Sequence, residues 1–163
     1  MRKALFLFMV FGLVGLMCGC EVGKTALSES DISDDYNEEV KKSLRKLILT
    51  GNCKECPFVG VDISGKDLSH KDLTGADLSK ANLSQADLKF ANLKDADLNK
   101  ANLSQADLSD ALLLRADLSY ATLIEANLRN ADLTGASMKE ANLNGAILCN
   151  TKTPWGLDNS GCK

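Results

Sequence analysis

Residues 75–83 read Gly-Ala-Asp-Leu-Ser-Lys-Ala-Asn-Leu, and the pattern of this stretch continues along most of the chain. An apolar centre stands at every fifth position from Phe58 to Leu148, which gives nineteen centres without an insertion. Ala stands two residues before each centre from Leu78 onward, and Asp or Asn usually stands one residue before it. The repeated unit is therefore Ala-(Asp/Asn)-Leu-x-x.

A period of five residues excludes the two common regular structures. Neither an α-helix nor a flat β-strand keeps one residue in five on the same side over ninety residues. A coil that turns a corner every five residues does, and four units per coil would stack residues i and i+20 about 4.8 Å apart. The Leu side chains would fill the centre, the Ala side chains would pass the tight wall, and no cavity would remain for a substrate. The sequence thus predicts an all-β solenoid over 51–148.

The run at residues 75–83 resembles the pentapeptide-repeat family, and the resemblance extends over about 56–148. It implies a right-handed quadrilateral β-helix; the handedness and the square section come from the resemblance and not from the period. Lys66 and Lys71 depart from the pattern, because they stand at the Ala position of the first coil. Burying an ammonium group is costly, so we expect both side chains to extend past the N-terminal rim.

The first twenty residues have the pattern of an export signal. Arg2 and Lys3 precede an apolar run that continues to Met17, which is typical of a signal peptide and too short to span a bilayer, since spanning takes about 20 apolar residues. Residues 16–20 read Leu-Met-Cys-Gly-Cys and resemble a bacterial lipobox. We therefore expect a lipoprotein signal peptide over 1–19 and diacylation, including palmitate, at Cys20. The alternative is an ordinary cleaved signal peptide and a soluble secreted protein.

The resemblance to lipoproteins also predicts a location. Glu21 follows Cys20, in place of the Asp that commonly retains lipoproteins in the inner membrane. We expect a lipid-anchored protein of the bacterial cell envelope, in the outer membrane and facing the periplasm.

Two segments separate Cys20 from the repeats. Residues 20–37 are polar and acidic and cannot bury enough apolar surface to offset their ordering entropy, which predicts a flexible tether. Residues 38–50 carry apolar side chains at helical spacing and end at Gly51, which predicts an amphipathic helix. Asp35 and Glu38 suggest a capping box at its start.

Both ends of an open coil expose unpaired backbone and apolar side chains, which other chains can join. We expect the helix at 38–50 to be an N-terminal α-helical cap. The tail at 149–163, which contains Trp155 and Leu157, is expected to be the C-terminal cap.

Four cysteines remain after the signal region. Export implies an oxidising compartment, so disulfides are permitted. Cys149 and Cys162 are expected to close a loop around the C-terminal cap. Cys53 and Cys56 are expected to form a structural disulfide or a buried pair, and the alternative is a redox or metal site.

The Asp and Asn residues alternate from unit to unit, so four units per coil place Asp above Asp. Two acidic columns are predicted: Asp77, Asp97 and Asp117 on one face, and Asp67, Asp87 and Asp107 on the opposite face. The resemblance allows a functional interpretation, because some family members imitate duplex DNA and bind topoisomerase. We favour the other interpretation, in which Asp and Asn suit the turns by bonding nearby backbone.

Three outward apolar residues, Phe90, Leu112 and Leu114, are expected near one corner of the coil. They form either a contact patch for a partner protein or a second copy of the chain, or the ordinary scatter of exposed apolar residues.

No catalytic constellation is present in the sequence. His70 is the only His, and the chain has no phosphate-binding Gly loop and no Ser-His-Asp set. We expect a non-enzymatic interaction or scaffold module without cofactor or metal, held at a membrane through the lipid on Cys20, with an unidentified protein partner and no nucleic acid. The alternatives are a DNA-mimicking gyrase binder and a redox or metal protein using Cys53 and Cys56.

Overall fold

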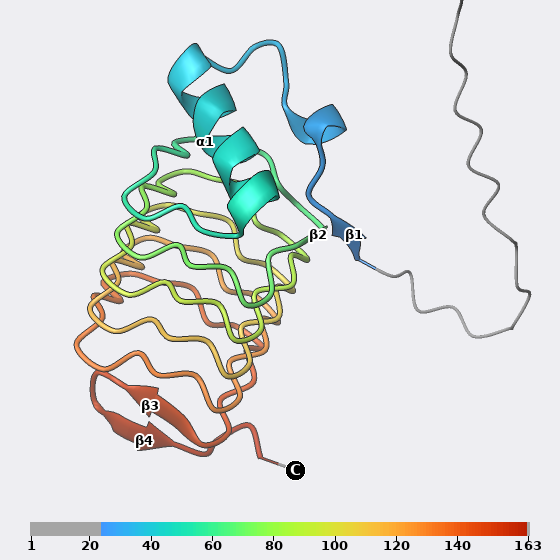
Figure 1. The fold of residues 1–163 in the computed structure, drawn as a ribbon. Coiled ribbons are helices and arrows are strands. Elements are labelled where there is room, and N and C mark those ends of the chain that lie inside the picture. The colour runs from blue at the N-terminus through green and yellow to red at the C-terminus, as the bar shows by residue number, and fades with distance from the viewer. Residues whose placement is uncertain (1–23, 163) are drawn as a thin grey trace, which may run out of the picture.

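The computed structural model describes residues 24–162, and its dominant feature is a stack of coils (Figure 1). Parallel β-bridges join residue i to residue i+20, from the pair Asn52 and Asp72 to the pair Asp132 and Lys152. A shift of twenty residues equals four units of five, so each coil has four sides, as the family resemblance implies. The predicted signal peptide at 1–19 and the predicted lipidation site Cys20 lie outside the described residues.

The core of the coil is filled along its length. Every apolar centre from Phe58 to Leu133 is at most 1% exposed, and so is every Ala of the repeat from Ala76 to Ala131. The repeat register also continues one unit beyond each end of the predicted series of centres, where Cys53 and Thr153 take centre positions and are buried. The coil therefore runs past the predicted boundary of 148.

Each unit turns its corner in the same way. The N–H at the Ala position donates to the carbonyl of the preceding centre, as in the 3.0 Å bond from Ala81 to Leu78. The residue before that Ala has a positive φ, 59° at Lys80 and 66° at Gly75, which is the conformation of the third residue in a type II turn. Most of these positions hold residues other than Gly, and their N–H groups bond to the next coil, as in the 2.8 Å bond from Lys80 to Asn99.

Helix α1 spans Glu38–Thr50 and lies across the N-terminal end of the coils (Figure 1). The Asn37 side chain caps it by accepting the Val40 N–H at 2.9 Å, so the expected capping box was wrong. Gly51 ends the helix with a φ of 67°. One stripe of the helix is buried, formed by Val40, Ser43, Leu44 and Leu47.

The segment before α1 is ordered against the first coil, in contrast to the flexible tether predicted for 20–37. Strand β1, Thr25–Ala26, pairs in parallel with β2, Lys66–Asp67. A short 3₁₀ helix, η1, follows at Glu29–Asp31, and Leu27 between them is only 8% exposed. The prediction is wrong for residues 24–36, because backbone pairing at a coil edge orders a segment that has little apolar surface to bury.

Polar contacts hold this segment at the first coil. The Lys66 ammonium lies 2.7 Å from an Asp31 carboxylate oxygen and 3.1 Å from the Thr25 hydroxyl. The Tyr36 hydroxyl accepts the N–H of Asp62 at 2.8 Å. Lys66 thus extends out of the coil as expected, but it ends on a carboxylate instead of in solvent.

The C-terminal end is not covered in the way that was predicted. Strand β3, Thr151–Thr153, continues the coil and pairs antiparallel with β4, Gly156–Asp158. The expected lid residues Trp155 and Leu157 are 61% and 62% exposed, because the hairpin that carries them projects beyond the coil. Gly161 packs closely instead, and a Cβ there would lie 2.6 Å from the Leu148 nitrogen.

None of the helices within residues 24–162 is long and apolar enough to cross a bilayer.

Candidate functional site

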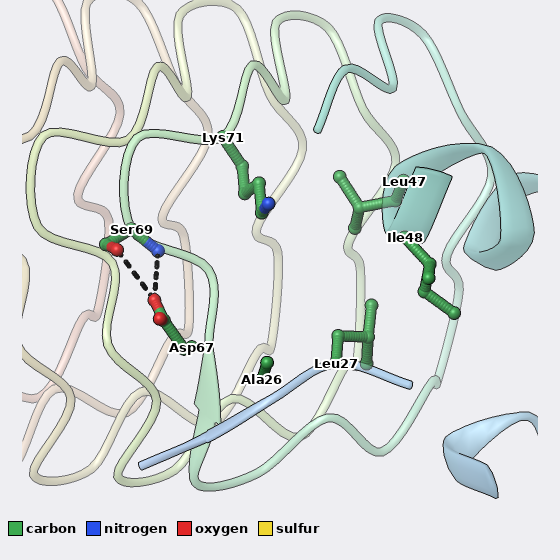
Figure 2. A pocket seen from close by; sticks show the side chains of 7 residues that line it. All are labelled: Ala26, Leu27, Leu47, Ile48, Asp67, Ser69 and Lys71. Atoms are coloured by element: carbon green, nitrogen blue, oxygen red, sulfur yellow. Dashed lines mark hydrogen bonds between the residues drawn. The ribbon is translucent and has the colours of Figure 1, made fainter. Parts of the chain in front are cut away.

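A cavity of about 300 Å³ lies between α1, the segment of Ala26 and Leu27, and the first coil (Figure 2). Its charged side chains come from Asp67 and Lys71. Asp67 accepts bonds from the Ser69 N–H and hydroxyl at 2.9 and 2.6 Å, so its carboxylate is held by its own turn. The cavity therefore offers no free pair of acid and base.

Lys71 has a structural position at this cavity. Its ammonium lies beside Gly51, where α1 ends, and a Cβ on Gly51 would be 3.5 Å from Nζ. Helix α1 has no basic residue in its last turn, so Lys71 supplies the positive charge that a helix C-terminus favours.

The two predicted acidic columns exist in the structure. Parallel β-bridges join Asp67 to Asp87 and Asp87 to Asp107. The same bridges join the members of the other column, Asp77, Asp97 and Asp117. Each carboxylate accepts the N–H of the residue two positions later, as Asp77 does from Ser79 at 3.0 Å. The carboxylates are therefore turned toward their own turns, which favours the turn interpretation over imitation of DNA phosphates.

Hydrogen bonds and one lysine stabilise the charged form in the column of Asp67. Bonds from the hydroxyl and N–H of Ser69 lower the pKa of Asp67. Lys89 lies 3.3 Å from Asp107 and 3.5 Å from Asp87, and its bond to Asp107 raises the pKa of Lys89. Burial acts to raise the pKa of Asp107, but the bonds from Ser109 and Lys89 outweigh it and the pKa is lowered.

No salt bridge of the described residues involves the column of Asp77, Asp97 and Asp117. Lys80 and Lys100 make no salt bridge within residues 24–162.

The corner residues with positive φ form side-chain ladders that were not expected from the repeat pattern. Gln85 donates to Gln105 at 3.2 Å, and Gln105 donates to Glu125 at 2.8 Å. On another corner, Arg115 binds both carboxylate oxygens of Asp95 at 2.7 Å. The sequence contained the information for these ladders, because the paired residues lie twenty positions apart at the second x of the repeat, directly before the Ala. The outer surface is thus a set of ordered polar columns.

Two of the three residues of the predicted contact patch, Phe90 and Leu112, are exposed near one corner of the coil. Phe90 is 52% exposed and stacks on His70, with ring centroids 4.9 Å apart. Leu112 is 45% exposed, and its N–H donates to the carbonyl of Ala91, the neighbour of Phe90. Leu114 is half-buried. The exposed apolar surface at this corner therefore consists of Phe90 and Leu112.

The C-terminal end is a second apolar surface. Met138 and Leu143 occupy centre positions but are only partly buried. Their N–H groups make no hydrogen bond to any described residue. With Trp155 and Leu157 exposed on the hairpin, this end offers both apolar side chains and an open β-edge.

The four cysteines form two disulfides. Cys149 is bonded to Cys162, as predicted, and Cys53 is bonded to Cys56. Cys53 and Cys56 are buried, so this pair supports the structural interpretation. Among residues 24–162 no group of three or more His, Cys, Asp or Glu residues could hold a metal ion.

The chain matches one family model, described as "Pentapeptide repeats (8 copies)", over residues 56–95, 72–110 and 111–150. No curated protein matches.

Several solved structures are similar to this chain. HetL from Nostoc, a pentapeptide repeat protein involved in heterocyst differentiation regulation, is 42% identical over 64% of this chain with a TM-score of 0.63. A pentapeptide repeat protein of the Arabidopsis thaliana thylakoid lumen is 38% identical over 58% of this chain with a TM-score of 0.57. Rfr23 from Cyanothece is 31% identical over 64% of this chain and 92% of its own, with a TM-score of 0.54. The matches span 50% of HetL and 66% of the Arabidopsis protein.

Proposed function

The chain belongs to the pentapeptide repeat family, whose coil is a right-handed quadrilateral β-helix, and from this premise we propose that it is a non-enzymatic interaction or scaffold module of the bacterial cell envelope. In this proposal a lipid on Cys20 holds the module at the membrane, α1 and residues 24–36 cap its N-terminal end, and the outer surface of the coil binds a protein partner.

The filled core carries this proposal. The apolar centres and the Ala wall leave no space inside the coil, and the cavities beside α1 lie outside it, at its N-terminal end. A substrate therefore has no enclosed site within the coil, whereas the ordered polar columns give a rigid outer surface. The family match indicates no catalytic family.

Palmitate labelling tests the membrane attachment. We expect wild-type protein to incorporate labelled palmitate and to sediment with membranes, and Cys20→Ala to lose both properties. Equal labelling of the two proteins would refute lipidation at Cys20.

The corner of Phe90 and Leu112 is the surface we propose for the partner. Crosslinking in intact envelopes followed by capture of this protein should recover a partner with wild type and lose it with Leu112→Asp. Val59→Asp is the matched control, because Val59 is 48% exposed elsewhere on the coil. Equal recovery with both variants would remove this patch from the proposal.

The same variants test whether the partner is a second copy. Sedimentation velocity of the purified protein should then show a dimer that Leu112→Asp dissociates and Val59→Asp does not.

DNA mimicry is less well supported. Each acidic column is three residues long, and its carboxylates bond to their own turns. A direct binding assay with gyrase would decide, and saturable binding that competes with DNA would restore this alternative.

A further inference from the structure

The ordered segment before α1 determines how closely the predicted lipid lies to the coil. Thr25 and Ala26 are paired with the first coil, and the Lys24 ammonium donates to the carbonyl of Ala86 at 3.2 Å. Cys20 stands four residues before Lys24. Four residues span at most about 14 Å even when fully extended. A lipid on Cys20 therefore holds the coil close to the bilayer.

The attachment point lies at the N-terminal end of the coil. Asp67 pairs with Ala26 on one side and with Asp87 of the next coil on the other. Strand β1 thus takes the place of a coil before the first one, at the same end as α1, and the β3–β4 hairpin lies at the opposite end (Figure 1).

The outer side of α1 has the character of a surface that contacts anionic lipid. Leu49 points away from the coil and is 79% exposed. Lys42, Arg45 and Lys46 are exposed on the same side of the helix. Arg45 lies 3.4 Å from Glu29. Glu39 and Glu55 line a second cavity together with Lys42, Lys46 and Lys54, so the basic groups among these residues outnumber the acidic ones by one. Basic residues near a membrane surface are attracted to anionic lipid headgroups, and an exposed Leu beside them adds apolar contact with the bilayer.

We propose that the outer side of α1, around Leu49, Lys42 and Lys46, rests on the phospholipid surface, so that the β-helix stands on its N-terminal end. This inference rests on the proposed lipidation of Cys20. The short connection to the anchor and the complementary charge both favour the bilayer as the occupant of this face. The hairpin with Trp155 then projects away from the membrane, where it is accessible to a partner.

Tryptophan quenching by brominated lipid tests this orientation. The lipidated protein is reconstituted into vesicles of phosphatidylethanolamine and phosphatidylglycerol, with or without brominated acyl chains. Trp155 is the only Trp of the wild type, so wild type reports the distal end. The double variant Leu49→Trp with Trp155→Phe, here the helix probe, reports the outer side of α1. The double variant Phe90→Trp with Trp155→Phe, here the flank probe, reports the side of the coil.

We expect brominated lipid to quench the helix probe at least twofold and to leave the emission of wild type and of the flank probe unchanged within experimental error. Quenching of the flank probe but not of the helix probe would mean that the coil lies on its side, which overturns the proposal. Equal emission of the helix probe with and without bromine also overturns it.

Lysine acetylation of the wild type gives a readout that needs no variant of α1. Lys42 and Lys46 should react several-fold more slowly in vesicles than in the soluble Cys20→Ala protein, whereas Lys139 of the last coil should react equally in both. Equal reactivity of all three lysines contradicts the proposed orientation. Palmitate on the reconstituted protein separates the two proposals: its absence refutes the anchor, and its presence with an unquenched helix probe refutes the orientation alone.

Discussion

Leu103 tests whether the stacked centres provide the stability of the coil. It is fully buried at the middle of the stack, between the centres of the coils before and after it. Leu103→Ala removes three carbon atoms, which at about 0.8 kcal/mol each is a transfer loss of about 2.4 kcal/mol. A cavity left in a backbone held by hydrogen bonds on both sides closes poorly, so we expect a total loss of about 3–4 kcal/mol in the free energy of unfolding.

Urea denaturation followed by circular dichroism measures this loss, with disulfides intact. Leu112→Ala is the matched control, because it is the same substitution at an outward position of the coil and 45% of the residue is exposed. We expect it to cost less than about 1 kcal/mol. A cost below about 1 kcal/mol for Leu103→Ala, or equal costs for both variants, would refute the packing argument.

Three further predictions concern the ends of the coil. Burial acts to raise the pKa of Asp31, but hydrogen bonds from Lys66 and Ser28 outweigh it and the pKa is lowered. The docking of residues 24–36 is therefore stable above about pH 4 and weakens as the pH falls through the folded pKa. Amide exchange of this segment should show that acid dependence in wild type and lack it in Asp31→Asn. Asn37→Ala should cost about 1 kcal/mol in unfolding free energy through loss of the helix cap, and a cost near zero in urea titrations would contradict that role. The disulfide between Cys149 and Cys162 closes a loop at sequence separation 13. Its reduction should raise amide exchange in the C-terminal hairpin by a factor that corresponds to about 3 kcal/mol. Unchanged exchange would count against a stabilising disulfide.

Local periodicity determined most of the fold. The interval of five residues predicted the coil and its filled core, and the family resemblance added four units per coil and hence the stacking of i on i+20. The bridges and the buried centres confirm these predictions. The helix over 38–50 was equally readable from its apolar stripe and Gly51. These features are encoded locally, because each unit repeats the same choice of inward and outward side chains.

The tertiary structure decided what happens at the two ends. The order of residues 24–36 depends on partners from the first coil, such as Lys66 for Asp31, and on a coil edge that exists only after the coil has formed. Trp155 and Leu157 look like lid residues in the sequence, but the hairpin turn directs them outward. Hydrophobic patterning ranks segments by the apolar surface they can bury, whereas residues 24–36 are held by backbone pairing and an ion pair between residues far apart in the sequence, which no local pattern records.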